Sequence, residues 1–168
     1  ILADPRSNKI QRDLNLKIKF RESFRPFAPS ILKNNLSEWF ETKLESPYML
    51  FVSKVKENKR LKISNKEKMF VGLKKLHVNR SIIPAVTHVD YSSRIQTVES
   101  KSNPFFYKLI NEFKKITNVP MLVNTSFNVR GEPIVCSPKD ALNCFNNTNL
   151  DILVIGNFIL IKNEFNQN

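Results

Sequence analysis

The sequence is poor in the residues that build disulfide frameworks and zinc sites, with two Cys and two His among 168 residues. Cys136 and Cys144 offer neither a set of disulfides nor the paired spacing of zinc ligands, which fits a protein of the reducing cytoplasm. His88 and Asp90 lie two residues apart, but no third ligand with metal spacing accompanies them. We therefore expect no metal centre, a cytoplasmic location and a packing role for each Cys.

Long hydrophobic runs are also missing. No apolar segment approaches the roughly 20 residues of a membrane helix, and the first residues lack the pattern of a signal peptide. With 41% hydrophobic residues, the chain is long enough to bury a core and short enough to form one domain over residues 1–168. The first residue is Ile rather than Met, and we expect a fragment of a longer polypeptide.

A polar turn follows a short apolar run near the middle of the second half of the chain. Residues 119–123 read as a buried strand, and residues 124–133 carry hydroxyl, amide and guanidinium groups directly after it. Open α/β sheets bind ligands at the carboxyl ends of their strands. Extended alternation would place Ser126 and Asn128 on one face and Phe127 on the other. The alternative is a surface turn in which these side chains satisfy local backbone groups.

A second polar segment, residues 19–30, interleaves cations with aromatic residues. If residues 19–25 are extended, one side carries Lys19, Arg21, Ser23 and Arg25, and the other carries Phe20, Glu22 and Phe24. Such a row would bind a polyanion, because Arg holds a phosphate or carboxylate through two bonds and Lys adds a mobile charge. The alternative is a solvated basic edge strand.

The remaining pattern predicts a mixed arrangement of helices and strands. We expect strands over residues 48–55 and 152–161, the latter interrupted at Gly156-Asn157, and alternation over 82–98 that puts His88 with Asp90 and Arg94 with Gln96. Helices are expected over 36–44, capped by Ser37, from Ser102 or Asn103 to about 117, and from Ser137 through 145. Residues 54–75 read as an exposed, charged excursion.

Several of these segments together resemble a known family in both order and spacing. The matching segments are residues 1–6, 19–30, 87–90, 94–98, 124–133, 142–145 and 150–158. They resemble the C-terminal domain of the nodulation-type O-carbamoyltransferases, which carbamoylate sugars and antibiotics. The resemblance implies an α/β (α+β), YrdC-like fold with a twisted mixed sheet flanked by helices. It also implies that ATP and carbamoyl phosphate are converted to carbamoyl adenylate. The family usually has a small residue, often Gly, where this chain has Tyr91.

The same resemblance implies the residues of the site. The Lys and Arg pair and the Ser-x-Asn motif around the nucleotide phosphates correspond to Lys19, Arg25, Ser126 and Asn128; Arg94 is the next cation expected in the pocket, followed by Arg130 and Arg21. Lys and Arg would bind phosphate and carbamoyl oxygens, and Ser and Asn would position them. The chemistry of the reaction calls for the same residue types. Joining two anions costs Coulomb energy, and fixed cations offset that cost. Such a transfer depends on positioning and charge stabilisation, so no activated nucleophile is required.

The resemblance also implies partners and cofactors. Mg²⁺ would be bound as a complex with ATP, since no acidic cluster in the sequence indicates a magnesium site built by protein ligands alone. An N-terminal ATP-binding transferase domain of the same polypeptide would carry out the carbamoyl transfer, so this chain should bind ligands without completing the overall reaction.

The net charge of +12 supports an alternative of another class, an RNA- or nucleotide-binding module without catalytic activity. Much of the excess charge lies in residues 54–62 and 66–75, where it mixes with Glu57 and Glu67 instead of forming one stripe. Six Phe residues fall at core-like spacing more than on a stacking platform: Phe20, Phe24, Phe27, Phe105, Phe106 and Phe113. We therefore favour the enzyme.

Overall fold

The computed structural model describes residues 1–162, which form two compact units. The first unit comprises residues 1–11 and 26–125, and the second comprises 12–25 and, of the described residues, 126–162. Helices accompany a five-stranded and a two-stranded sheet, which confirms the predicted mixed α/β class. The expectation of one domain over residues 1–168 stays a prediction. No helix within residues 1–162 is both long and apolar enough to cross a membrane.

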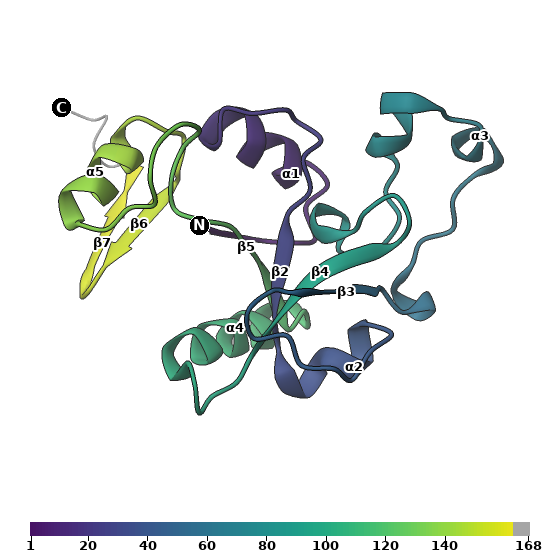
Figure 1. The fold of residues 1–168 in the computed structure, drawn as a ribbon, viewed down its shortest axis with the longest axis horizontal. Helices are drawn as coiled ribbons and strands as arrows, with labels where there is room; N and C mark the ends of the chain where they lie inside the picture. Colours follow the sequence, from purple (N-terminus) through teal and green to yellow (C-terminus); the bar gives the residue numbers. More distant parts are fainter. Residues whose placement is uncertain (163–168) are drawn as a thin grey trace. The chain divides into compact units, whose positions relative to one another are not determined.

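The first unit is built on a five-stranded mixed sheet (Figure 1). Its strands are β1 (Leu2–Ala3), β2 (Ala28–Leu32), β3 (Phe51–Lys54), β4 (Ser92–Val98) and β5 (Met121–Asn124), in the order β1-β5-β2-β4-β3. β2 runs parallel to β4, and the other neighbours are antiparallel. All five residues of β2 are buried, as expected of a central strand covered on both faces.

One long helix, α4 (Pro104–Thr117), covers part of this sheet. Its Ile110 packs with Leu32 of β2, Val98 of β4 and Leu122 of β5 in one buried cluster. The Asn103 side chain caps the helix by accepting from the Phe106 N–H, and Pro104 fits the first turn. The helix ends at Asn118, whose φ of 58° is the left-handed conformation common at helix ends. The predicted helix is confirmed at both ends.

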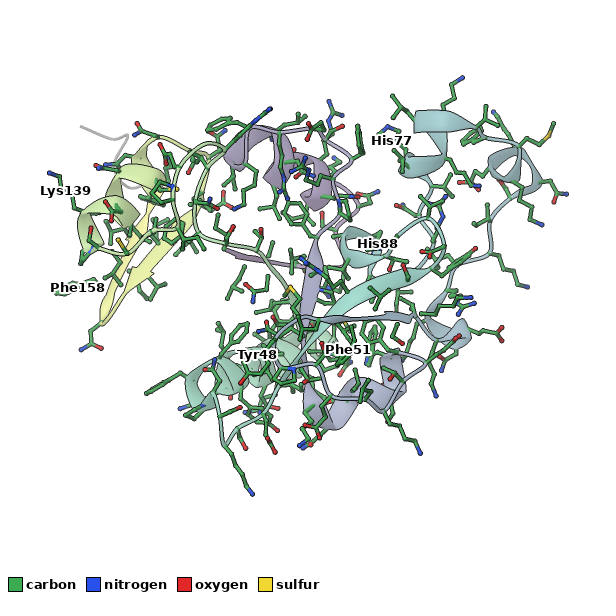
Figure 2. The ribbon with its side chains drawn as sticks, viewed as in Figure 1. Tyr48, Phe51, His77, His88, Lys139 and Phe158 are labelled. Carbon is green, nitrogen blue, oxygen red and sulfur yellow. The ribbon has the colours of Figure 1, made fainter. Side chains whose placement is uncertain are left out.

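The second unit contains α5 (Pro138–Asn146) and a hairpin of β6 (Ile152–Ile155) and β7 (Phe158–Ile161), drawn side by side in Figure 1. Ser137 and Asp140 form a reciprocal capping box at the start of α5. The hairpin turns at Gly156, whose φ is +57°. Ala141 and Phe145 of α5 pack on Leu153 of β6. The predicted helix and the interrupted strand are both confirmed, and Figure 2 shows Lys139 and Phe158 projecting from this unit.

Two predicted elements are shorter than expected. The helix α2 covers only Leu36–Trp39 after a 3₁₀ turn over Lys33–Asn35, and Ser37 is not its cap. It stops because Phe40 turns extended, is fully buried and forms a bridge with Val55. The strand expected over 48–55 is β3, which starts only at residue 51.

The alternation over residues 82–91 does not form a strand. Pro84–Val86 is a 3₁₀ turn, and the chain turns again before β4. Asp90 accepts the Ser92 N–H at 3.0 Å, and His88 Nδ1 lies 3.2 Å from Ser92 Oγ. Both side chains therefore shape a turn instead of sharing a strand face.

Tyr91, which stands where the resemblance implies a small residue, has a φ of 65°. This left-handed conformation explains why Gly suits the position. In this chain the Arg60 guanidinium lies 5.0 Å from the centroid of the Tyr91 ring.

The charged excursion is confirmed as exposed short pieces. They are 3₁₀ turns over Glu57–Lys59 and Gly72–His77 and the helix α3 (Asn65–Lys68), none of which buries a residue. The helix α1 covers Ile10–Asp13. Of the two thiols, Cys144 is buried as predicted, whereas Cys136 is exposed, so its predicted packing role is wrong.

Candidate functional site

A cavity of about 360 Å³ lies entirely within the second unit. It is lined by Lys19, Arg21, Glu22, Arg25, Ser126, Asn128, Val129 and Arg130. The structure therefore brings together five of the six predicted site residues, together with Arg21, from two segments about a hundred residues apart in the sequence. Whether they bind a ligand stays a prediction.

The first of these segments is not the predicted strand. Residues Leu14–Ile18 form a π-helical turn that buries Leu14 and Ile18, and the Lys19 N–H donates to the Leu14 carbonyl at 2.8 Å. Phe20 then adopts a φ of +48°, which reverses the direction of the chain. Because the segment bends, its side chains do not alternate across a sheet, and the cations gather around a hollow instead of forming a row.

Lys19 joins the two segments. Its side chain is buried, with 4% of the residue exposed, and the ammonium donates to four oxygens of the facing turn. These are the Ser126 carbonyl, Ser126 Oγ at 3.1 Å, the Asn128 carbonyl at 3.0 Å and Asn128 Oδ1 at 2.9 Å. An ammonium has three protons, so at least one is shared. Lys19 thus holds the Ser-x-Asn turn against the loop that precedes β2.

The charge of Lys19 depends on its surroundings. Burial, reinforced by the neighbouring Arg21 guanidinium, lowers the pKa of Lys19 to about 8. The ammonium form still predominates at neutral pH. It is lost as the pH rises above this value, and Lys19 then loses its charge-assisted hydrogen bonds.

Ser126 and Asn128 converge as the alternation predicts. Ser126 Oγ donates to Asn128 Oδ1 at 2.6 Å, and Asn128 Nδ2 donates to the Glu132 carbonyl at 2.9 Å. Phe127 points the other way and packs on the cluster formed by α5 and the hairpin. The turn therefore presents its polar side chains toward the cavity while its aromatic ring anchors it to the core of the unit.

The cavity has a strong excess of positive charge. Four of its lining residues are cations (Lys19, Arg21, Arg25 and Arg130), against the single carboxylate of Glu22. Glu22 Oε2 lies 3.4 Å from Arg25 Nη2. Its own backbone N–H, followed by the charges of Arg25, Arg130 and Arg21, holds the pKa of Glu22 below its ordinary value. Three guanidinium groups thus act on one carboxylate, as they would on a bound anion.

The sequence analysis missed the residue that shapes the basic loop. Asn15 is completely buried in the π-helical turn. Its Nδ2 donates to the carbonyls of Ser23, at 3.1 Å, and Arg25, at 2.8 Å, and its Oδ1 accepts from Arg21 Nε at 2.6 Å. A polar residue at an apolar helix position, four residues before Lys19, was the only available signal.

Arg94, the remaining predicted site residue, belongs to the first unit. It is exposed on β4 opposite Val52 of β3 and is not among the residues that line this cavity. Its place in a nucleotide site stays a prediction. Within residues 1–162, no group of three His, Cys, Asp or Glu side chains is arranged to hold a metal ion.

Comparison with known proteins places the chain in a family. The family described as "Carbamoyltransferase C-terminus" matches residues 1–162, and the chain belongs to it. This confirms the resemblance found in the sequence.

The relatives include proteins with and without a named activity. The chain is 52% identical over 162 residues to the uncharacterized protein sll1178 of Synechocystis sp. and 42% identical over 165 residues to nodulation protein NolO of Bradyrhizobium diazoefficiens. It is 31% identical over 156 residues to the 3'-hydroxymethylcephem-O-carbamoyltransferase of Amycolatopsis lactamdurans. These alignments cover 96%, 96% and 93% of this chain and 26% of each relative. The chain thus spans about a quarter of the length of these relatives.

Replacing Asn15 should open the basic loop. In Asn15→Leu the Ser23 and Arg25 carbonyls lose their buried donor, which costs about 1–3 kcal/mol in the free energy of unfolding. We expect a lower urea midpoint and faster trypsin cleavage after Arg21, whereas the Arg25–Pro26 bond resists trypsin in either protein. Asn149→Leu, an exposed position of the same unit, is the matched control and should change neither. Unchanged cleavage in Asn15→Leu would show that Asn15 does not hold the loop.

Proposed function

We propose that this chain is the part of a carbamoyltransferase that binds ATP and carbamoyl phosphate and forms carbamoyl adenylate. Membership of the carbamoyltransferase C-terminus family supports the reaction class. The observation that carries the proposal is the cavity in which four cations surround a single carboxylate, because the reaction brings several anions together.

The chemistry requires charge stabilisation more than a nucleophile. Carbamoyl phosphate first loses its phosphoryl group to water as inorganic phosphate. An oxygen of the resulting carbamate then bonds to the α-phosphorus of ATP, and pyrophosphate leaves. Each approach of anion to anion costs Coulomb energy, which fixed guanidinium groups offset in place. No covalent protein intermediate is needed.

Roles follow from the geometry. Arg25 and Arg130, both exposed at the cavity, offer planar forks for phosphate oxygens. Lys19 contributes its charge while holding the Ser-x-Asn turn, and Ser126 and Asn128 position the ligand through hydroxyl and amide groups. Glu22 alone is a poor cage for Mg²⁺, so the ion would arrive on ATP, where it neutralises phosphate charge.

Carbamoyl transfer to the acceptor belongs, in this proposal, to another part of a longer polypeptide, an N-terminal ATP-binding transferase domain. The chain's coverage of about a quarter of its relatives supports this division. Both Cys residues are free thiols, as expected in the cytoplasmic compartment that we propose.

A specific observation keeps an RNA- or nucleotide-binding module as the second candidate. The prediction that the Phe residues serve the core holds for Phe27, which is buried, and for Phe106 and Phe113, which pack against the core, but it is wrong for three others. Phe20, Phe24 and Phe105 are 49%, 42% and 88% exposed. Phe20 and Phe24 lie beside Arg21 and Arg25, and exposed rings among cations can stack on bases.

Calorimetry with ATP and carbamoyl phosphate tests the proposal. Each ligand should strengthen binding of the other, and Lys19→Ala or Ser126→Ala should abolish the effect. Arg25→Ala should weaken ATP binding by about tenfold, or about 1.4 kcal/mol. Its exposed side chain makes unfolding an improbable cause of the loss.

Arg12→Ala serves as the control, since Arg12 is exposed in the same unit but does not line the cavity. No binding of either ligand would contradict the proposal. Salt-sensitive binding to generic RNA that survives Ser126→Ala would favour the second candidate.

Neutralising Glu22 should strengthen anion binding. Among the cavity-lining residues in the described part of the chain, Glu22 is the one carboxylate that competes for the guanidinium groups, and Glu22→Gln removes its charge. We expect about fivefold tighter binding of tripolyphosphate in a competition assay. Asp151→Asn makes the same charge change away from the cavity and should have little effect. Equal effects of the two variants would mean that only net charge matters.

A further inference from the structure

A second cavity of about 500 Å³ lies in the same unit as the first. It is lined by Phe20, Val129, Glu132, Pro133, Ile134, Val135, Cys136, Asp140, Asn143, Cys144 and Asn147. The two cavities share Val129, and Phe20 lies in the chain between Lys19 and Arg21, which line the first. The two cavities are therefore neighbours, lined in part by the same loop and turn.

The charges of the two cavities are opposite. Among residues 1–162, no Lys or Arg lines the second cavity, whereas Glu132 and Asp140 do. An anionic group would be repelled there and attracted to the first cavity, with its four cations and one carboxylate. A ligand that spans both must be negative at one end and neutral at the other.

One face of α5 supplies polar groups to the second cavity. Asp140, Asn143, Cys144 and Asn147 follow the three- and four-residue spacing that aligns side chains on a helix. Asn143 and Asn147 are exposed, and within residues 1–162 neither side-chain amide has a hydrogen-bond partner in the protein. An amide donates and accepts at once, so this pair suits a ligand edge that carries both kinds of group.

The second cavity also has an apolar part. Pro133, Ile134, Val135 and the Phe20 ring line it, and Ile134 is 62% exposed. Pockets with apolar walls and a few convergent polar groups are typical of small-molecule sites, and a volume of about 500 Å³ falls in their range.

We infer that the second cavity holds the nucleobase of a nucleotide whose phosphates lie in the first. The inference rests on the proposed function, which it extends by naming a base subsite. A base has two apolar faces for the Phe20 ring and the aliphatic wall, and a polar edge of donors and acceptors for Asn143 and Asn147. Its neutrality matches a cavity that excludes phosphate.

Comparing ATP with tripolyphosphate tests the inference, because only ATP carries a base. Asn143→Leu should weaken ATP binding by about fivefold and leave tripolyphosphate binding within about twofold of the original protein. Asn146→Leu is the matched control: it lies on α5, is exposed and does not line the cavity, so it should change neither. Equal losses for both ligands, or no loss for either, would overturn the base subsite.

Alkylation of Cys136 gives a second readout that needs no variant. The exposed Cys136 lines the cavity, while burial raises the pKa of the Cys144 thiol and slows its reaction. Saturating ATP should protect Cys136 from iodoacetamide about fivefold or more, and saturating tripolyphosphate should not. Equal rates with the two ligands would place the base elsewhere.

The two proposals fail in distinguishable ways. If the protein binds neither ATP nor tripolyphosphate, the proposed function fails and the base subsite with it. If it binds both, but Asn143→Leu and Cys136 report no difference between them, the phosphate site stands and only the base subsite is lost.

Discussion

The buried ammonium of Lys19 holds the candidate site together. It binds four oxygens of Ser126 and Asn128, residues more than a hundred positions away in the chain. A buried charge without such partners would cost several kcal/mol, so the loop and the turn are each stable in this form only beside the other. The interaction converts two segments that are unremarkable separately into one cavity with a positive wall.

The same interaction links stability to function. Because burial lowers the pKa of Lys19 to about 8, the group is charged at neutral pH but close to losing its charge. The Glu22 carboxylate lies among the guanidinium groups to which, under the proposed function, the anions of a ligand would bind. Glu22 thus partly compensates the positive charge of the cavity. Among the described residues, the neighbouring cavity is lined by acids and by no Lys or Arg, a division of charge that would orient a nucleotide under the function that we propose.

The parts of this arrangement that depend on residues close together in the chain could be predicted from the sequence. The Asn103-Pro104 start of α4 and the Ser137–Asp140 capping box are local signals, and both hold. The convergence of Ser126 and Asn128 follows from extended alternation. The choice of cavity residues depended on family resemblance, and the comparisons confirm the family. Alternation alone did not reveal that the two segments meet.

The failures arise where distant contacts override local pattern. Residues 19–25 alternate like a strand, but the π-helical turn before them and the buried amide of Asn15 bend them into a loop. The helical sequence pattern of α2 continues past Trp39. The helix nevertheless ends there, because Phe40 is buried in the core and forms a bridge with Val55. Tyr91 takes a left-handed conformation that its residue type does not favour. Spacing could not show that Phe20 and Phe24 are exposed.

A crystal structure of the protein soaked with ATP and carbamoyl phosphate tests the central claim most directly. The account predicts phosphate density in the cavity between residues 19–25 and 126–130, with Arg25 and Arg130 at hydrogen-bonding distance from phosphate oxygens. Nucleotide phosphates bound at another surface, with this cavity empty at saturating ligand, would contradict it.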